Sequence, residues 1–489
     1  MLVPIQSRFF LPLVVSALLI LVLAAFYGQM LPKGSFQHGD EFFTLDRTHS
    51  FTIRDDWFTV YSENLPTFKK PPLQYWIGAW LLEGGVDKEL ALRLPSFVFA
   101  IAILMMTGLL ALMLLPGSPW VIPAAILLIA SSERFWESAV SPLLDAGATL
   151  FATVALVATF SAVRQPRWWY VVAFACGVGA LQKAPIPVVI SLAVIAGIAL
   201  TRAHHDLLLG RSLRSKHFLI ASAIGLALIL AWPTLQWLRY GSEAFQQAYL
   251  SQIVDRFSPF GEEWGKRRAF DSLLLAGEPI LRLFAIAAVF WLPWRLRRLE
   301  LVGLPAMLAI YAIVVAGSAG IVSPRYSLVF MPMLMASLAT MILTVVPGWR
   351  WRSASVGLLC LASLGPFKPA GMLGILQDGQ TKFVPLLEHV GEAIRPDETL
   401  IVCGRGKGDP RIYRGAISYY ASAGRPFYRI KSPEDLLQLQ DLGTIHPPYR
   451  SFCGAGKFEA LRPVLKEVVV VETVGEFVHW TASGASGQH

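Results

Sequence analysis

The chain has 489 residues, of which 55% are hydrophobic and only 15% are charged, and its mean hydropathy is +0.53. Soluble domains carry roughly 25% charged residues, so this composition excludes an ordinary soluble enzyme and indicates an integral membrane protein. The net charge of +9 does not indicate a nucleic-acid partner. Basic residues of a polytopic chain usually lie in cytoplasmic loops and set its orientation. We therefore expect membrane lipids, and no nucleic acid, as partners.

Apolar runs predict the membrane spans. The first, residues 9–29, follows Arg8 as a signal peptide would, but its length and poor cleavage sequence favour an uncleaved span. Further runs follow at 91–115, 119–132, 139–163, 168–181, 184–201, 217–239, 274–294, 301–320, 324–346 and 353–370. Some are short or interrupted, so we predict about 11–13 transmembrane helices. Residues 73–84 are too short to cross and are expected to form an interfacial helix.

Charges in the loops predict the orientation. With the N-terminus inside, the inner loops carry many arginines and few acids, as the positive-inside rule requires. These arginines are Arg164, Arg167, Arg202, Arg211, Arg214, Arg295, Arg297, Arg298, Arg350 and Arg352. The outer loops 31–90 and 240–272 mix both signs. An odd number of spans then places the residues after ~370 on the outer side.

The last part of the chain, 371–489, predicts a small α/β domain. Thr399–Cys403 and Glu467–Glu472 are typical of buried strands, and Glu476–Trp480 is typical of a final strand. Ser432 is placed to cap a helix whose first turn is acidic.

The four cysteines have no spacing typical of a metal site. Cys403 and Cys453 both lie in the C-terminal domain. In an oxidising compartment they can form a disulfide, which would close a loop of ~50 residues and contribute about 4 kcal/mol in the chain-entropy model. The sequence leaves this pairing open.

The outer loop 31–90 begins with a polar cluster, His38-Gly39-Asp40-Glu41. A carboxylate here can accept a proton from an acceptor hydroxyl or bind a divalent cation. The alternative is that both acids merely solvate a loop. His38 with Asp40 and Glu41 allows a divalent metal site, but the spacing is not diagnostic. We therefore assign no cofactor and leave a metal open.

A second cluster, Lys69-Lys70-Pro71-Pro72-Leu73, opens the interfacial segment, and Tyr75 follows it. The prolines fix the backbone and remove hydrogen-bond donors. A lysine held in this way is a fixed charge at the height of the lipid headgroups, which suits a phosphate. The alternative is ordinary snorkelling of the lysines to the headgroups.

Isolated ionisable residues border later spans. Asp145, Lys183 and Arg325 lie at the outer ends of apolar runs, and Tyr326 follows the last of them. Such groups are costly in a membrane and usually line a polar cavity. The alternatives are a helix cap for Asp145 and snorkelling for Lys183. Arg256 lies in loop 240–272, where a solvated surface explains it equally well.

These features together resemble one group of enzymes. In chain order they are Asp40-Glu41, Lys70-Pro71-Pro72-Leu73, Arg93-Leu94-Pro95-Ser96, Leu144-Asp145, Lys183 and Pro324-Arg325-Tyr326. They are similar to the bacterial polyprenyl-phosphate-sugar glycosyltransferases of the GT-C fold. That group includes aminoarabinose transferases acting on lipid A and relatives of the protein O-mannosyltransferases. The resemblance covers roughly residues 1–350.

The resemblance implies a GT-C transmembrane catalytic domain at 1–370 and a periplasmic α/β domain at 371–489. It implies that Asp40 and Asp145 are the catalytic carboxylates, with Asp40 on the acceptor side. It assigns the donor phosphate to Lys70, Lys183, Arg256 and Arg325. Further candidates for the substrate cavity are Glu41, Lys69, Tyr75 and Tyr326. Some relatives carry an acid at the position of Lys69, so a lysine there argues against a metal ligand and adds positive charge.

The implied function is transfer of a sugar from a polyprenyl (undecaprenyl-type) phosphate donor to a lipid A or lipopolysaccharide-type acceptor. The reaction would take place at the periplasmic face of the bacterial inner membrane. Two alternative acceptors are protein serine or threonine and another extracytoplasmic glycan. A lipid or solute transporter is less well supported, because the ionisable residues gather at one face and the two halves show no symmetry.

Overall fold

The chain forms two compact units. The computed structural model describes residues 7–34, 36, 39–183, 185–201, 206–246, 279–316, 324–364, 384–403, 414–422, 425–475 and 477–486. One unit comprises Met1–Lys33, Thr67–Gly78 and Leu90–Met372, and the other comprises Gly34–Pro66, Ala79–Glu89 and Leu373–His489. These two units differ from the expected domains 1–370 and 371–489, because much of loop 31–90 belongs to the same unit as the C-terminal region.

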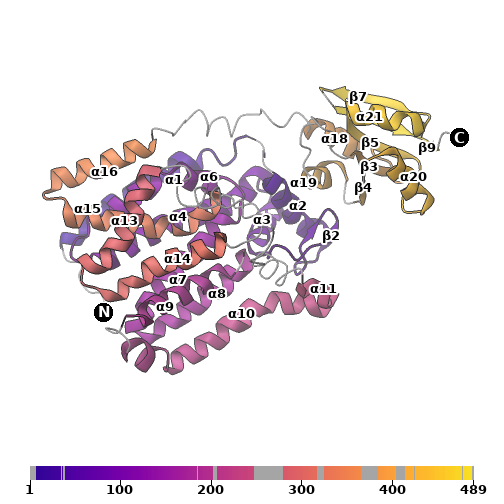
Figure 1. Ribbon diagram of the computed structural model, residues 1–489. Coiled ribbons are helices and arrows are strands. Elements are labelled where there is room, and N and C mark those ends of the chain that lie inside the picture. The colour runs from indigo at the N-terminus through magenta and orange to yellow at the C-terminus, as the bar shows by residue number, and fades with distance from the viewer. Residues whose placement is uncertain are drawn as a thin grey trace. The chain divides into compact units, whose positions relative to one another are not determined.

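The first unit is helical throughout its described part (Figure 1). Its helices are α1 (Ser7–Gly28), α3 (Leu73–Glu83), α4 (Lys88–Leu114), α5 (Val121–Ala130), α6 (Glu133–Val140), α7 (Asp145–Arg164), α8 (Trp169–Gln182), α9 (Ile186–Ala199), α10 (Lys216–Tyr240), α11 (Ser242–Phe245), α13 (Pro279–Arg295), α14 (Gly303–Ala316), α15 (Met331–Val345) and α16 (Trp349–Leu364). The end of α3 and the first two residues of α4 belong to the second unit. The short turns are η1 (Pro166–Trp168), η3 (Asp206–Ser212), η6 (Leu299–Val302) and η7 (Pro324–Phe330).

Every apolar run expected to be a span contains one of these helices, and the expected interfacial segment 73–84 is α3. Among the described residues, five helices are long and apolar enough to cross a membrane: Arg8–Gly28, Lys88–Leu114, Asp145–Arg164, Lys216–Tyr240 and Arg325–Val345. Others are apolar but shorter, so the total of 11–13 stays a prediction. The expected start of one span at residue 139 was wrong. Helix α6 ends at Val140, because Pro142 disfavours helix in the residue before it, and α7 begins only at Asp145.

Burial separates central helices from peripheral ones. The apolar windows of Asp145–Arg164 and Arg325–Val345 are 78% and 83% buried, whereas that of Arg8–Gly28 is only 11% buried. Helix α7 achieves its central place with small buried residues and packs against α8 and α9. Helix α1 instead exposes leucines such as Leu18 and Leu21. An apolar exposed face of this kind suits contact with lipid.

The second unit contains a helix that the sequence had presented as a loop. Helix α2 (Gly39–Arg54) carries Asp40 and Glu41 in its first turn, where negative charge is favoured by the helix dipole. The antiparallel hairpin of β1 (Tyr61–Ser62) and β2 (Leu65–Pro66) follows it.

The C-terminal part of this unit is built around a five-stranded sheet with the order β4-β3-β5-β8-β7 (Figure 1). Its strands are β3 (Thr399–Cys403), β4 (Phe427–Ile430), β5 (Tyr449–Gly454), β7 (Val469–Val474) and β8 (Phe477–Ala482). Strands β6 (Leu465–Lys466) and β9 (Gly484–Ala485) pair separately. The helices and turns are α18 (Val384–Ala393), α19 (Arg414–Ala416), η8 (Ile417–Ala421), α20 (Pro433–Asp441), α21 (Ala455–Leu461) and η9 (Arg462–Val464).

Several local predictions for this part can be compared with the sheet. The strand at Thr399–Cys403 is confirmed, and Ser432 accepts a hydrogen bond from the backbone N–H of Asp435 as the cap of α20. The prediction of a buried strand at Glu467–Glu472 was wrong in its burial, because β7 is an edge strand with exposed valines. Cys403 and Cys453 form a disulfide between the neighbouring parallel strands β3 and β5.

Close packing of α19 on α2 joins the two parts of the second unit. A Cβ atom on Gly415 would lie 2.5 Å from the carbonyl carbon and oxygen of Phe42 and 2.7 Å from the backbone nitrogen of Phe43. Backbone atoms cannot move aside as a flexible side chain can. A glycine is therefore required at this position.

We predict that Gly415→Ala destabilises the protein by about 1–3 kcal/mol, because one added methyl group overpacks the contact with α2. Gly456→Ala is the matched control, since a Cβ there meets nothing within 4 Å and alanine favours its helix by up to ~1 kcal/mol. Thermal unfolding of the purified protein in detergent measures both. Equal stability of the two variants would contradict the packing described for Gly415.

Candidate functional site

The first unit contains an ion pair buried at the start of its central helix. The Lys183 ammonium Nζ lies 2.6 Å from Oδ1 of Asp145, and the two side chains are only 15% and 9% exposed. Asp145 is the first residue of α7, and Leu144 occupies the cap position without a side-chain cap bond. The alternative that Asp145 is a helix cap is therefore wrong. Lys183 follows the last turn of α8, which brings it to the same end of the helix bundle.

Other cations surround the same carboxylate. Besides Lys183, Asp145 interacts electrostatically with Arg325 and Lys70. The ammonium of Lys183 also lies 4.9 Å from the centre of the Tyr326 ring, within the range of a cation–π contact. Three cations thus act on the carboxylate of Asp145. A group of cations in a largely buried site suits an anion with charge-assisted hydrogen bonds.

A chain of buried amide and hydroxyl groups fixes the helix ends that carry the pair. Nε2 of Gln182 donates to Oε1 of Gln74 at 2.7 Å and to the carbonyl oxygen of Leu144 at 3.2 Å. Gln74 donates in turn to the hydroxyl of Ser96 at 2.9 Å, and Ser96 donates to the carbonyl oxygen of Leu143 at 3.0 Å. The chain links α3, α4, α8 and the residues before α7. It ties the neighbours of Lys183 to those of Asp145.

The Arg93-Leu94-Pro95-Ser96 motif has a structural explanation. Arg93 is 2% exposed and donates to the carbonyl oxygens of Leu31 and Lys33, at 2.9 and 2.6 Å. It thereby holds the end of the first span against α4, while Ser96 joins the amide chain. Gly147 lets α7 approach closely, because a Cβ there would collide with the Gln182 side chain.

The remaining predicted site residues fall in several places. Asp40 is exposed on α2, Glu41 beside it is buried, Lys69 is exposed, and Tyr75 is buried on α3. Asp40 and Glu41 belong to the second unit, so their meeting with Lys70 stays a prediction. Arg256 and His38 lie outside the described residues. Within the described part of the chain, no three His, Cys, Asp or Glu side chains are grouped so as to hold a metal ion.

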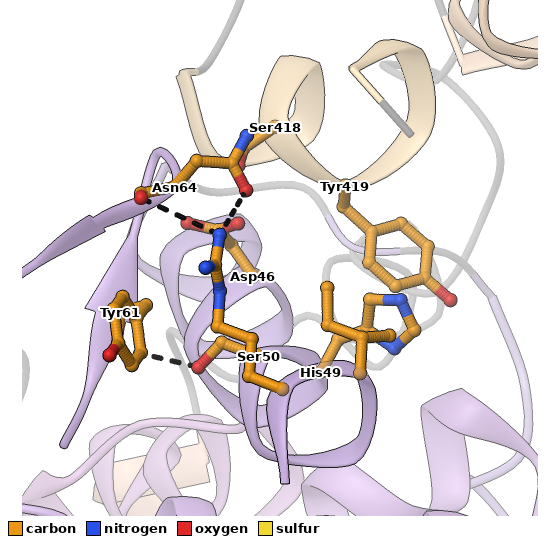
Figure 2. Close-up of a pocket in the computed structure, with 9 residues that line it drawn as sticks. Asp46, His49, Ser50, Tyr61, Asn64, Ser418 and Tyr419 are labelled. Atoms are coloured by element: carbon orange, nitrogen blue, oxygen red, sulfur yellow. Dashed lines mark hydrogen bonds between the residues drawn. The ribbon is translucent and has the colours of Figure 1, made fainter. Parts of the chain in front are cut away.

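The second unit has its own polar cavity of about 480 Å³ (Figure 2). It is lined by α2, the β1–β2 hairpin and the η8 turn, and its residues are Asp46, His49, Ser50, Ile53, Arg54, Tyr61, Asn64, Ser418 and Tyr419. Those contributed by α2 recur at helical spacing and share one face of that helix. Nη2 of Arg54 donates a hydrogen bond to the side-chain oxygen of Asn64 at 3.0 Å.

Burial changes the pKa values of two ionisable groups in this cavity. Burial raises the pKa of the Asp46 carboxyl to about 6, although Ser418, the backbone N–H of Glu63, Ser62 and Arg47 act in the opposite direction. Burial also lowers the pKa of His49. The guanidinium of Arg54 lies 4.5 Å from the centre of the Tyr61 ring. The cavity therefore offers hydrogen-bonding groups of both kinds with little net charge near neutral pH.

Several of these residues do not stand out in the sequence as site residues. Gln74 and Gln182 could have been found from the sequence, since each is a polar side chain within an otherwise apolar run. Such side chains in a membrane usually form hydrogen bonds with each other. Asp46 and Arg54 could not, because the segment around them was taken as a loop. Their common face appears only once α2 is known to be a helix.

Comparison with known proteins identifies the fold. No protein-family model and no curated protein sequence matches the chain. Solved structures do match. ArnT from Cupriavidus metallidurans bound to undecaprenyl phosphate matches with a TM-score of 0.71 and 15% identity, over 97% of this chain and 99% of that chain, and its apo state matches with a TM-score of 0.67 and 14% identity, over 97% and 99%. The archaeal oligosaccharyltransferase AglB from Archaeoglobus fulgidus, in complex with an inhibitory peptide and a dolichol-phosphate, matches with a TM-score of 0.58 and 12% identity, over 93% of this chain and 70% of that chain. The chain therefore has the GT-C fold of membrane glycosyltransferases, as the sequence predicted.

We predict that Asp46→Asn changes how stability depends on pH. The pKa of Asp46 is raised from 3.8 to about 6 in the folded protein. Its contribution to stability is therefore fully present below pH 4 and is lost as the pH rises through about 6. At ~1.36 kcal/mol per pKa unit, the loss is about 3 kcal/mol. An asparagine carries no charge, so the variant should be more stable than the wild type at pH 7.5 and should lose this advantage at pH 4.

Thermal unfolding in detergent between pH 4 and 8 measures this difference. Asp441→Asn is the control, because its side chain is exposed at the end of α20. If Asp46→Asn follows the wild-type pH profile, as the control should, then Asp46 does not titrate as described.

Proposed function

We propose that this GT-C protein is a glycosyltransferase that uses a polyprenyl-phosphate-linked sugar, and that it acts at the periplasmic face of the bacterial inner membrane. The observation that carries the proposal is the buried cluster in which Lys70, Lys183 and Arg325 act on the single carboxylate Asp145. The solved structures that share the fold support it, since ArnT was determined with undecaprenyl phosphate and AglB with a dolichol-phosphate. The cluster would receive the donor phosphate.

The cations of the cluster would interact more strongly with the leaving group than with the donor. In the donor the phosphate is a diester with one negative charge. When the bond from the sugar C1 to the phosphate oxygen breaks, the phosphate becomes a monoester and gains a second charge. The attraction between the cations and the phosphate would therefore grow along the reaction, and interactions that strengthen in this way are the ones that accelerate it. Removal of one such electrostatic contact commonly costs ~10²–10³ in rate.

The carboxylates of Asp145 and Asp40 would have different roles in the reaction. Asp145 holds Lys183 at 2.6 Å and would keep it oriented toward the phosphate. Asp40, exposed at the start of α2, would accept the proton of an acceptor hydroxyl as the acceptor oxygen bonds to C1. If the acceptor is itself a phosphate, no base is required, and Asp40 would position the sugar. Arg256 stays a candidate phosphate ligand.

We further propose a lipopolysaccharide-type acceptor such as lipid A. The polar cavity of the second unit supports this choice, because a carboxyl, a guanidinium and an amide together suit the hydroxyls of a saccharide. The exposed Lys69 adds a positive charge that suits an anionic glycolipid. Protein serine or threonine and another extracytoplasmic glycan are the alternative acceptors. A transporter is disfavoured, because the described cluster lies at one end of the central helix, whereas transporters bind near the membrane midplane.

We predict that Lys70→Ala lowers transfer by about 100-fold or more, because it removes one of the fixed cations that face the leaving phosphate. The assay is mass spectrometry of lipid A and core oligosaccharide from a deletion strain complemented with each variant. Lys33→Ala is the control, since Lys33 is an exposed lysine near the end of the first span. Thermal stabilisation by added undecaprenyl phosphate, measured on the same purified variants, reports phosphate binding separately from transfer.

Full transfer by Lys70→Ala would exclude Lys70 from the site. If the deletion strain has unchanged lipid A and core oligosaccharide while the wild-type protein binds undecaprenyl phosphate, the acceptor proposal is wrong and the donor proposal stands.

A further inference from the structure

The helical unit contains a cavity that lies away from the proposed donor site. It has a volume of about 630 Å³ and is formed by the last turns of α4 and α7 together with η1 and the segment before α14. Its lining residues are Leu110, Met113, Leu114, Pro116, Phe160, Ser161, Arg164, Gln165, Trp168, Arg298, Glu300 and Leu301. The function proposed above uses none of them.

This cavity and the Asp145–Lys183 pair lie at opposite ends of one helix. Helix α7 has 20 residues, with Asp145 at its first position and Arg164 at its last. At ~1.5 Å per residue the helix is about 30 Å long, which equals the thickness of the hydrocarbon core of a bilayer. If Asp145 lies at the outer face, the cavity lies at the inner face. The loop arginines independently predict this side to be cytoplasmic.

The wall and the rim of the cavity differ in character. Most of the wall is apolar, including the side chains of Leu110, Phe160 and Leu301. At the rim, Oε1 of Glu300 accepts hydrogen bonds from Arg164 at 3.1 Å and from Arg298 at 2.9 Å. Two guanidinium groups thus share one carboxylate oxygen.

The two arginines of the rim are not equivalent. Arg298 also donates to the carbonyl oxygens of Met113 and Leu114, at 3.0 and 3.1 Å, and so caps the end of α4. The Arg164 side chain is 64% exposed, and among the described residues its ion-pair contact is with Glu300. A guanidinium has five N–H donors. Arg164 is therefore the group best placed to bind an additional anion.

We propose that this cavity binds one anionic phospholipid of the inner leaflet. The phosphodiester would bind Arg164, an acyl chain would lie along the apolar wall, and Trp168, which is 37% exposed, would lie at headgroup level. The exposed guanidinium of Arg164 suits a lipid with a net negative charge, such as phosphatidylglycerol. A soluble anion would not use the apolar wall, and a lipid without net charge would be attracted less strongly by the arginines of the rim.

The lipid would hold together the ends of α4 and α7 and the segment before α14, all of which line this cavity. Basic residues continue beyond the rim, since Arg167, Arg295 and Arg297 are exposed on the adjoining turns. They would raise the local concentration of anionic lipid. The proposal concerns binding and does not depend on the transferase reaction.

Native mass spectrometry of the purified full-length protein tests the proposal, with phosphatidylglycerol and phosphatidylcholine as probes. We predict selective retention of one phosphatidylglycerol by the wild type. Arg164→Gln should weaken that binding by about 10-fold or more, because a charge-assisted hydrogen bond is lost. Ser161→Phe should weaken it as well, by filling the half-buried apolar part of the cavity without changing any charge. Arg350→Gln is the control, since Arg350 is an exposed arginine on α16 outside the cavity.

The proposal is overturned if phosphatidylcholine binds as tightly as phosphatidylglycerol, or if Arg164→Gln and Arg350→Gln weaken binding equally. Should Arg164→Gln fail to fold, Ser161→Phe decides the matter: unchanged binding of phosphatidylglycerol by a stable Ser161→Phe protein also overturns the proposal. Unfolding temperatures measured without added lipid verify that each variant is folded.

Discussion

The end of the helical unit at which α7 begins depends on the buried contact between Asp145 and Lys183. Both side chains have lost most of their hydration, and a buried pair offsets this loss only when its geometry is close. The 2.6 Å contact meets this condition. The amide chain through Gln182 and Gln74 supports the contact, because it joins the helix ends around the pair. The position of α7 relative to α8 is thereby fixed, and so is the charge pattern that a phosphate would meet.

Small residues make this arrangement sterically feasible. Helices in a membrane gain no hydrophobic free energy from each other, so they rely on close packing and interhelical hydrogen bonds. At Gly147 any side chain would occupy the position of Gln182. At Gly179 a Cβ would lie 2.6 Å from Pro187 and 3.0 Å from Phe151. The glycines and alanines of α7 and α8, which carry no chemistry, are thus a condition for the charged cluster to form.

Helices in the apolar runs could be predicted well from the sequence, because long apolar runs have few alternatives in a membrane protein. The sequence also pointed to Lys70, Asp145, Lys183 and Arg325, since isolated charges beside such runs are conspicuous, and the structure brings these four into one electrostatic cluster. It failed where the signal was local and polar. Residues 39–54 alternate charged and apolar types with no clear border, so α2 was taken as a loop. The valines of β7 suggested burial, but the sheet order that leaves this strand at an edge depends on pairings distant in sequence.

The two ends of α7 show how the fold separates different uses of positive charge. Asp145 at its N-terminus and Arg164 at its C-terminus both complement the helix dipole, so each charge is favoured where it lies. At its C-terminal end Glu300 accepts hydrogen bonds from two arginines, and the lipid diester that we propose there would be bound and not changed. At its N-terminal end Lys183, Arg325 and Lys70 act on the carboxylate of Asp145. A donor phosphate bound there, as we propose, would be attracted more strongly by these cations as the sugar leaves and the phosphate gains its second charge.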